Sequence, residues 1–111
     1  VDDQPQNNLY ERRAFASAGI FCDTFTNNSD AIEAIKRLDY DLVISDIGRA
    51  DLDETGWDLL QEIKSKGLHL PFIFYTWGIT DDTRAKVMAE RADGITETPD
   101  ELAQLVFKLT T

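Results

Sequence analysis

The sequence predicts an α/β fold in which a parallel sheet is covered by helices on both sides. Short apolar runs alternate with helical patterns along the whole chain, and this alternation is typical of strand–helix–strand units. The runs at 42–44 and 71–75 contain no polar residue other than a tyrosine hydroxyl, as expected for strands buried on both faces. With 111 residues and no linker or repeat, the chain is expected to form a single domain over residues 1–111.

The first expected element is a helix that follows the opening segment VDDQPQ. Asn7 or Asn8 could cap this helix, and Gly19 provides a stop after about Ala18. Its apolar residues fall on one helical stripe and are expected to face the core: Tyr10, Ala14, Phe15 and Ala18.

A strand, a helix and a second strand are expected next. Residues 20–25 read as a strand, and residues 27–30 form a loop that ends in a helix cap. The helix runs to Leu38, and its apolar face holds Ile32, Ile35 and Leu38. The segment 42–45 is too short for a helix and is rich in β-branched residues, so it is predicted to be a buried strand that ends before Asp46.

A polar loop with three more acids, residues 48–55, leads to a helix from about Gly56 to Lys66. Gly67 ends this helix, which is expected to bury Leu59, Leu60 and Ile63. Pro71 opens the most hydrophobic stretch, a strand that ends at Thr76.

The last part of the chain predicts two helices around one short strand. The first helix spans about 81–91, with acids at its start and a base at its end, as the helix dipole prefers. Residues 94–96 form the strand, and Pro99 lies in the first turn of the final helix. The buried face of that helix is expected to hold Leu102, Leu105, Val106 and Leu109.

Composition excludes several classes of function. A formal net charge of −10 argues against direct binding to nucleic acid or to an anionic membrane. The single cysteine, Cys22, excludes an internal disulfide, fits a reducing compartment, and is expected to be a core residue. No segment reaches transmembrane length and no signal peptide is visible, so a cytoplasmic location is expected.

Three carboxylates are expected to converge at one edge of the sheet. Asp2 and Asp3 read as the end of a strand whose body would precede Val1 and is absent from the given sequence, and Asp46 ends the strand at 42–45. A lone Asp at such a point more often caps a helix or opens a loop. Three acids together repel one another unless a cation neutralises them, and their oxygen ligands suit Mg²⁺. Thr76 would add a hydroxyl, so the set could hold a phosphoryl group.

In these stretches the chain resembles the CheY-like receiver domain of bacterial response regulators, and the resemblance covers essentially all 111 residues. It is carried by VDD at 1–3, DLVISD at 41–46, PFIFYT at 71–76 and the turn at 94–99. The resemblance implies a flavodoxin-like fold, (βα)5 with strand order 2-1-3-4-5, whose first strand is largely absent from the given chain.

The resemblance also implies roles for individual residues. Asp46 would be the phosphoacceptor, and Thr76 would bind a phosphoryl oxygen. Asp2 and Asp3 would bind Mg²⁺ together with Asp46 and the main-chain carbonyl of Gly48. The donor would be a histidine kinase or a phosphotransfer protein of a two-component phosphorelay. Such a domain is not an enzyme beyond its own phosphorylation and dephosphorylation.

The chain departs from the family pattern at the parts that sense and report phosphorylation. Thr98 stands where the family has a lysine, and Ile95 stands at the position of the switch aromatic. Trp77 follows Thr76 where a small residue is usual, and is expected to cover Asp46 partly. The loop at 48–56 is longer than usual and lacks the usual proline. These departures predict an atypical receiver.

Three functions stay open on the sequence alone. The first is a receiver phosphorylated on Asp46 with altered switching, and the second is a pseudo-receiver that binds partners independently of phosphate. The third is a Mg²⁺-dependent phosphatase or phosphotransferase with an Asp nucleophile, but the only histidine, His69, is expected at the far end of its strand. By resemblance, a homodimer, an output domain or another partner would contact the face of the fourth helix, fifth strand and fifth helix, where Phe107 lies outside the core stripe.

Overall fold

The computed structural model describes residues 1–48 and 53–111. Its elements, in chain order, are η1 (Pro5–Asn8), α1 (Leu9–Ser17), α2 (Asn28–Arg37), β1 (Val43–Ser45), α3 (Gly56–Ser65), β2 (Phe72–Tyr75), α4 (Asp81–Ala89), β3 (Gly94–Thr96) and α5 (Pro99–Thr110). Among these residues no helix is long and apolar enough to cross a membrane.

The strands β1, β2 and β3 form a parallel sheet in that order. The register places Ser45 opposite Phe74, and Phe74 opposite Ile95. All three strands therefore end at the same edge of the sheet, close to Asp46, Thr76 and Glu97.

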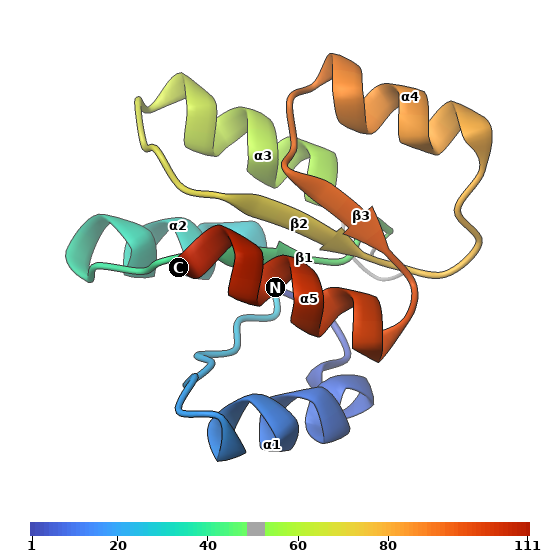
Figure 1. The fold of residues 1–111 in the computed structure, drawn as a ribbon. Coiled ribbons are helices and arrows are strands. Elements are labelled where there is room, and N and C mark those ends of the chain that lie inside the picture. The colour runs from blue at the N-terminus through green and yellow to red at the C-terminus, as the bar shows by residue number, and fades with distance from the viewer. Residues whose placement is uncertain (49–52) are drawn as a thin grey trace.

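The sheet divides the core into two layers, as Figure 1 shows with α3 and α4 on one side and α1 and α5 on the other. On the first side, buried residues of α2, α3 and α4 pack against Val43, Phe72 and Phe74. On the second side, Phe15 of α1 and two residues of α5 pack against Ile73. Alternate residues of each strand thus face opposite layers, and the predicted α/β fold with a parallel sheet is confirmed.

Residues 20–25 do not form the predicted strand, and that prediction is wrong for this structure. Backbone hydrogen bonds nevertheless place them beside residues 1–2, which in turn lie beside β1. The N–H of Asp2 donates to the carbonyl of Phe25 at 2.9 Å, and the N–H of Asp46 donates to the carbonyl of Val1 at 3.1 Å. The amino group of Val1 also donates to the carbonyl of Ile44. The lateral order is therefore residues 20–25, residues 1–2, β1, β2 and β3, which is the 2-1-3-4-5 order.

The predicted core face of α1 is largely wrong. Only Phe15 of the stripe is buried, and Tyr10, Ala14 and Ala18 are exposed. Neither asparagine caps the helix through its side chain, because the amide of Asn8 donates to Asp2 and that of Asn7 to Gln4. The helix ends where predicted, before Gly19, whose φ of +83° suits glycine.

Two further predictions near the amino terminus need correction. Helix α2 begins earlier than expected, because Asn27 caps it and accepts from the N–H of Asp30. Leu38 follows the helix and is 56 % exposed, so it does not join the buried face. Cys22 is exposed and is not a core residue.

The helices after β1 match the sequence well. Leu59, Leu60 and Ile63 of α3 are buried, and Gly67 follows the helix with a φ of +70°. Leu102 and Val106 of α5 are buried, with Leu105 and Leu109 packed beside them. Pro99 lies in the first turn of α5, where its missing N–H is no loss.

Candidate functional site

Three carboxylates meet at the carboxyl edge of the sheet, as predicted. One oxygen each from Asp2, Asp3 and Asp46 lies within 4.8 Å of the others, and all three residues are partly buried. Asp46 reaches this place because it directly follows β1, and Asp2 and Asp3 reach it because Val1 is paired beside that strand. We call these three residues the acidic cluster.

Asp2 is held firmly through both of its carboxylate oxygens. The N–H of Gln4 donates to Oδ1 at 2.8 Å, and Nδ2 of Asn8 donates to Oδ2 at 2.9 Å. Asn8 was predicted as a helix cap, so its role in holding Asp2 was missed. An Asn six residues after an Asp gives no signal of this contact, because the contact depends on the turn η1 that folds the chain back.

The backbone on the other side of Asp46 is fixed by α3. Thr55 and Asp58 form a capping box at its first turn, each bonding the other's backbone N–H. The N–H of Gly56 donates to the carbonyl of Ile47 at 2.8 Å, which ties the start of α3 to the segment after Asp46. The buried Oγ of Ser45 donates to the carbonyl of Asp46 at 2.7 Å. Asp46 is thus placed by two elements, β1 before it and α3 after it.

Gly48, the predicted carbonyl ligand, is exposed two residues after Asp46. A Cβ built on Gly48 would meet nothing within 4 Å, so there is open space on that side of the residue. Residues 49–52, which include Asp51 of the predicted acidic loop, lie outside the described residues. Glu54 from the same loop accepts from the N–H of Asn28 at 2.7 Å and so belongs to the contact with α2.

Thr76 follows β2 at the same edge of the sheet. Its N–H donates to the carbonyl of Thr96 at 3.1 Å, which extends the pairing of β2 with β3 by one residue. The strand register therefore places Thr76 at the edge where Asp46 ends its own strand. His69 is exposed before β2, at the opposite edge, as predicted.

Two of the positions where the sequence departs from the receiver pattern have structural roles here. The hydroxyl of Thr98 accepts from the N–H of Glu101 and caps α5. Ile95 lies on β3, is 7 % exposed and packs into the core layer with Phe74. Thr98 brings no cation to the acidic cluster, and Ile95 offers no ring that could change position.

Trp77 does not cover Asp46, and that prediction is wrong. Its indole is 84 % exposed, so it packs against little of the protein. The chain turns directly after it at Gly78, whose φ is +70°. The exposed position of Trp77 leaves the approach to the acidic cluster less obstructed than the sequence suggests.

The cluster suits a small divalent cation in donor type and spacing. An octahedral Mg²⁺ with oxygen ligands at about 2.1 Å places those ligands roughly 3–4 Å apart. Carboxylate oxygens already within 4.8 Å of one another would need only small shifts to share such an ion. Asp3 and Asp46 could bind directly, whereas the two hydrogen bonds on Asp2 favour a contact through water.

Among the residues that the structure describes, Tyr75, directly before Thr76, has a strongly raised pKa. The hydroxyl of Tyr75 donates to Oε1 of Glu11 at 3.0 Å. Burial, followed by this hydrogen bond to the carboxylate, raises the pKa of Tyr75 to about 12. Tyr75 packs with the layer of α1 and α5, so it links the end of β2 to α1.

Comparisons with known proteins agree with this architecture. A family model described as the response regulator receiver domain matches residues 1–109. The transcriptional regulatory protein PcoR of Escherichia coli is 28 % identical over 113 residues, a match that covers 100 % of this chain and 48 % of PcoR. The DNA-binding transcriptional regulator NtrC of Escherichia coli K12 is 37 % identical over 76 residues, which cover 68 % of this chain and 16 % of NtrC. The chain spans about half the length of these curated relatives, or less.

Solved structures give the same fold. A Francisella response regulator receiver domain has a TM-score of 0.86 at 20 % identity, covering 98 % of this chain and 91 % of that one. The response regulator TrrA of Thermotoga maritima, solved in complex with Mg²⁺–BeF, has a TM-score of 0.80 at 27 % identity. That match covers 97 % of this chain and 93 % of TrrA.

Proposed function

Because the chain belongs to the response regulator receiver domain family, we propose that it accepts a phosphoryl group on Asp46 from a histidine kinase or a phosphotransfer protein. The observation that carries this proposal is the meeting of Asp2, Asp3 and Asp46 within 4.8 Å at the carboxyl edge of the sheet. Residues 1–111 would act as one receiver unit, and the domain would perform no chemistry on other substrates.

The residues present can support this transfer. A carboxylate oxygen of Asp46 forms the new bond to phosphorus while the bond from phosphorus to the donor nitrogen breaks, and that nitrogen keeps the electron pair. Thr76, at the same sheet edge, would donate its hydroxyl to a phosphoryl oxygen. Mg²⁺ held by Asp3, Asp46, the Gly48 carbonyl and, through water, Asp2 would supply positive charge for the phosphoryl oxygens.

The response to phosphorylation would be atypical. In the family pattern a lysine pairs with the phosphoryl group, and an aromatic side chain changes position with it. Here Thr98 caps α5 and Ile95 is fixed in the core. A change at Asp46 would therefore have to reach the surface by another route, through the loop after Asp46 or the start of α3.

The same two observations favour a second candidate, a pseudo-receiver that binds its partner in a phosphate-independent way. Partners remain proposals in either case. The relatives include transcriptional regulators and the sensor histidine kinase RcsC of Escherichia coli, of which this chain spans 11 %. By analogy with these relatives, the receiver would be joined to an output domain or to a kinase. A cytoplasmic location fits either arrangement.

Intact-mass measurement after incubation with acetyl phosphate and Mg²⁺ tests the proposal. We expect one added phosphoryl group on the protein, and none on the Asp46→Asn variant. Asp41→Asn is the matched control, because Asp41 is an exposed acid before β1, at the opposite end of the strand from Asp46. It should be phosphorylated like the unaltered protein.

Two results would count against phosphorylation at Asp46. An unchanged mass with saturating donor and Mg²⁺ would leave the pseudo-receiver as the better description. An added group that survives in Asp46→Asn would place the acceptor at another residue.

A further inference from the structure

Asn8 lies beside the acidic cluster but contributes no carboxylate to it. Its side-chain amide is partly buried and donates from Nδ2 to Oδ2 of Asp2 at 2.9 Å. The N–H of Gln4 donates to the other oxygen of the same carboxylate, Oδ1, at 2.8 Å. Asp2 therefore has one donor on each carboxylate oxygen, and the protein itself sets the orientation of this side chain.

The turn η1 holds Asn8 at the place that this contact requires. The N–H of Asn7 donates to the carbonyl of Gln4 at 3.0 Å, which closes the turn. From α1, Nη2 of Arg12 donates to the carbonyl of Pro5 at 3.4 Å. Both bonds are made to backbone carbonyls, so they fix the path of the chain up to Asn8. The amide of Asn8 is thus preorganised toward the acidic cluster.

The neighbouring carboxylate, that of Asp3, is held differently. In the part of the chain that the structure describes, no hydrogen-bond donor holds the side chain of Asp3. Its carboxylate can therefore turn toward a cation without losing a hydrogen bond. The carboxylate of Asp2 cannot turn both of its oxygens toward one cation without losing a bond to Gln4 or to Asn8. Two adjacent acids of the cluster thus differ in how closely they can approach a cation.

The number of carboxylates that bind a cation directly helps to decide which divalent cation a site prefers. Mg²⁺ keeps several waters and is bound through one or two carboxylates, whereas Ca²⁺ takes about six to eight oxygen ligands, often with a carboxylate bound through both oxygens. While Asp2 is held back, two carboxylates of the cluster remain for direct contact, those of Asp3 and Asp46. Release of Asp2 would offer a third, and the larger cation would gain more from it.

We propose that Asn8 is a positioning residue for cation specificity, which favours Mg²⁺ over Ca²⁺ at the acidic cluster by holding Asp2 out of direct contact with the ion. This inference rests on the proposed cation site and adds to it a residue that lies outside the cluster. Asn8 touches neither the cation nor the phosphoryl group and acts through the orientation of Asp2. Loss of its amide would free Oδ2 of Asp2, which would disorder the contact through water that suits Mg²⁺ and give Ca²⁺ a further direct ligand.

Calorimetric titration of the protein with Mg²⁺ and, separately, with Ca²⁺ tests the proposal. In Asn8→Ala the Kd for Mg²⁺ is expected to rise about tenfold, because a residue that orients a metal ligand has been removed. The Kd for Ca²⁺ is expected to stay the same or to fall, so the ratio of the two constants should shift toward Ca²⁺ by about tenfold or more. Asn8→Asp keeps the shape of the side chain but replaces its donor by an acceptor. It should shift the ratio in the same direction, and it provides the test if the alanine variant does not fold.

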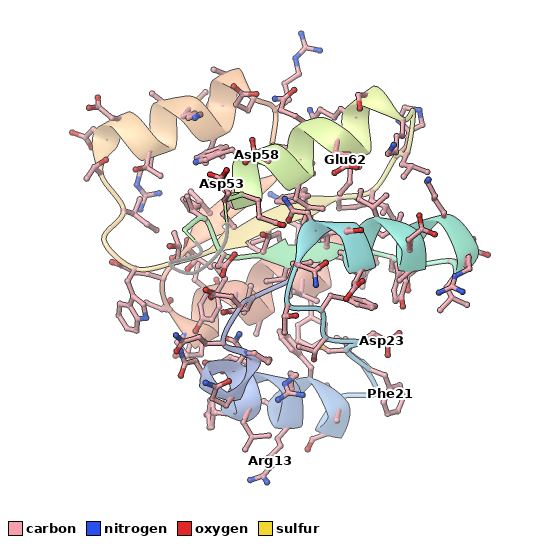
Figure 2. The ribbon with its side chains drawn as sticks, turned by 180° about the vertical axis from the view of Figure 1, so that it is seen from behind. Arg13, Phe21, Asp23, Asp53, Asp58 and Glu62 are labelled. Carbon is pink, nitrogen blue, oxygen red and sulfur yellow. The ribbon has the colours of Figure 1, made fainter. Side chains whose placement is uncertain are left out.

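Two control variants should leave the ratio of the two Kd values unchanged. Asn7→Ala is matched to the test variant within the same turn, because the amide of Asn7 donates to Oε1 of Gln4 at 3.4 Å and not to the cluster. Glu62→Gln controls for cations that bind elsewhere on this acidic protein. Figure 2 shows Asp58 and Glu62 on α3, on the opposite side of the molecule from α1, and Glu62 lies 3.9 Å from Nζ of Lys66.

Three results would overturn the proposal, and they separate it from the cation site on which it rests. An equal loss of affinity for both cations in Asn8→Ala would show that Asn8 only stabilises the turn. An unchanged ratio in Asn8→Ala, together with binding that Asp3→Asn removes, would overturn the role of Asn8 and leave the cation site in place. Failure of the unaltered protein to bind either cation would overturn both.

Discussion

A Cβ on Gly56 would lie 1.9 Å from the main-chain oxygen of Asp46. The same Cβ would lie 2.9 Å from the ring of Phe74 and 2.9 Å from Oγ of Ser45. The first residue of α3 is thus in contact with the backbone that carries the proposed phosphoacceptor, and only glycine allows this approach. The position of Asp46 therefore depends on residue 56 having no side chain.

Gly56→Ala should therefore destabilise the protein strongly. The clash involves a backbone oxygen, which cannot turn away, so α3 must move from β1, at a cost of about 1–3 kcal/mol or more. Chemical denaturation measures the change. Gly48→Ala is the control, since nothing lies within 4 Å of its added Cβ and its stability should change little. Equal effects of the two changes would show that the contact with Asp46 is not the cause.

Mg²⁺ should raise the melting temperature, because a cation that binds the acidic cluster binds only the folded state. The rise should shrink in Asp3→Asn, which removes one of the two direct ligands we propose. Asp41→Asn changes the net charge equally but lies away from the cluster, so its Mg²⁺ response should stay intact. Identical melting curves with Mg²⁺ and with EDTA would rule out a cation site of useful affinity.

Thr98→Ala should lower the free energy of unfolding by about 1 kcal/mol, because it removes the N-cap of α5. Thr98→Ser keeps the hydroxyl and should be close to the unaltered protein. Urea denaturation of the three proteins makes the comparison. If Ser and Ala are equally destabilising, the methyl group rather than the cap is what matters at this position.

Alkaline pH should destabilise the protein through Tyr75. Its pKa is raised in the folded protein to about 12, from an ordinary value of 10.0, so folding favours the neutral phenol. This contribution is fully present below pH 10 and is lost as the pH rises through 12. Tyrosinate absorbance should show a group that titrates near pH 12, and Tyr75→Phe should remove it. A titration curve unchanged by Tyr75→Phe would show that the late-titrating group is another tyrosine.

Phe107 on α5 should anchor a homodimer or partner contact on the face of α4, β3 and α5. Its side chain is 43 % exposed, while Leu102 and Val106 of the same helix are buried. Phe107→Ser should weaken self-association in sedimentation at micromolar concentration, and the contact should depend little on phosphate. Tyr10→Ser, at an exposed aromatic of α1, is the control. This interface would be excluded if the unaltered protein is monomeric and Phe107→Ser loses no partner in a pull-down.

The strands and helices from β1 onward follow from local patterns. The runs at β1 and β2 are apolar on both faces, and the stripes of α3 and α5 match the residues that are buried. The acidic cluster also follows from the sequence, since carboxyl ends of neighbouring parallel strands meet at one edge. The sequence does not predict that Asn8 and Gly56 support this cluster. Each of these contacts depends on how two segments fold together, and no local pattern shows that.

Several of the errors lie on the side of β1 that does not pair with β2. Residues 20–25 have the composition of a strand, and Phe15 and Ala18 have the spacing of a core stripe. Composition and spacing give the local preference of a segment, but they do not show which neighbour it packs against. In the structure a cavity lies between residues 20–25 and β1, residues 20–25 are irregular, and most of the α1 stripe is exposed.

The backbone bonds that hold Val1 and Asp2 also help to keep the acidic cluster together. Two of its three carboxylates lie on a segment attached laterally by these bonds, outside every strand of the sheet. Backbone bonds at the edge of a sheet open more readily than those inside it. The amide hydrogen of Asp46, which is bonded to Val1, should then exchange with solvent faster than that of Val43, which is bonded to Pro71. The lifetime of a bound cation would be limited by this local opening rather than by unfolding of the domain.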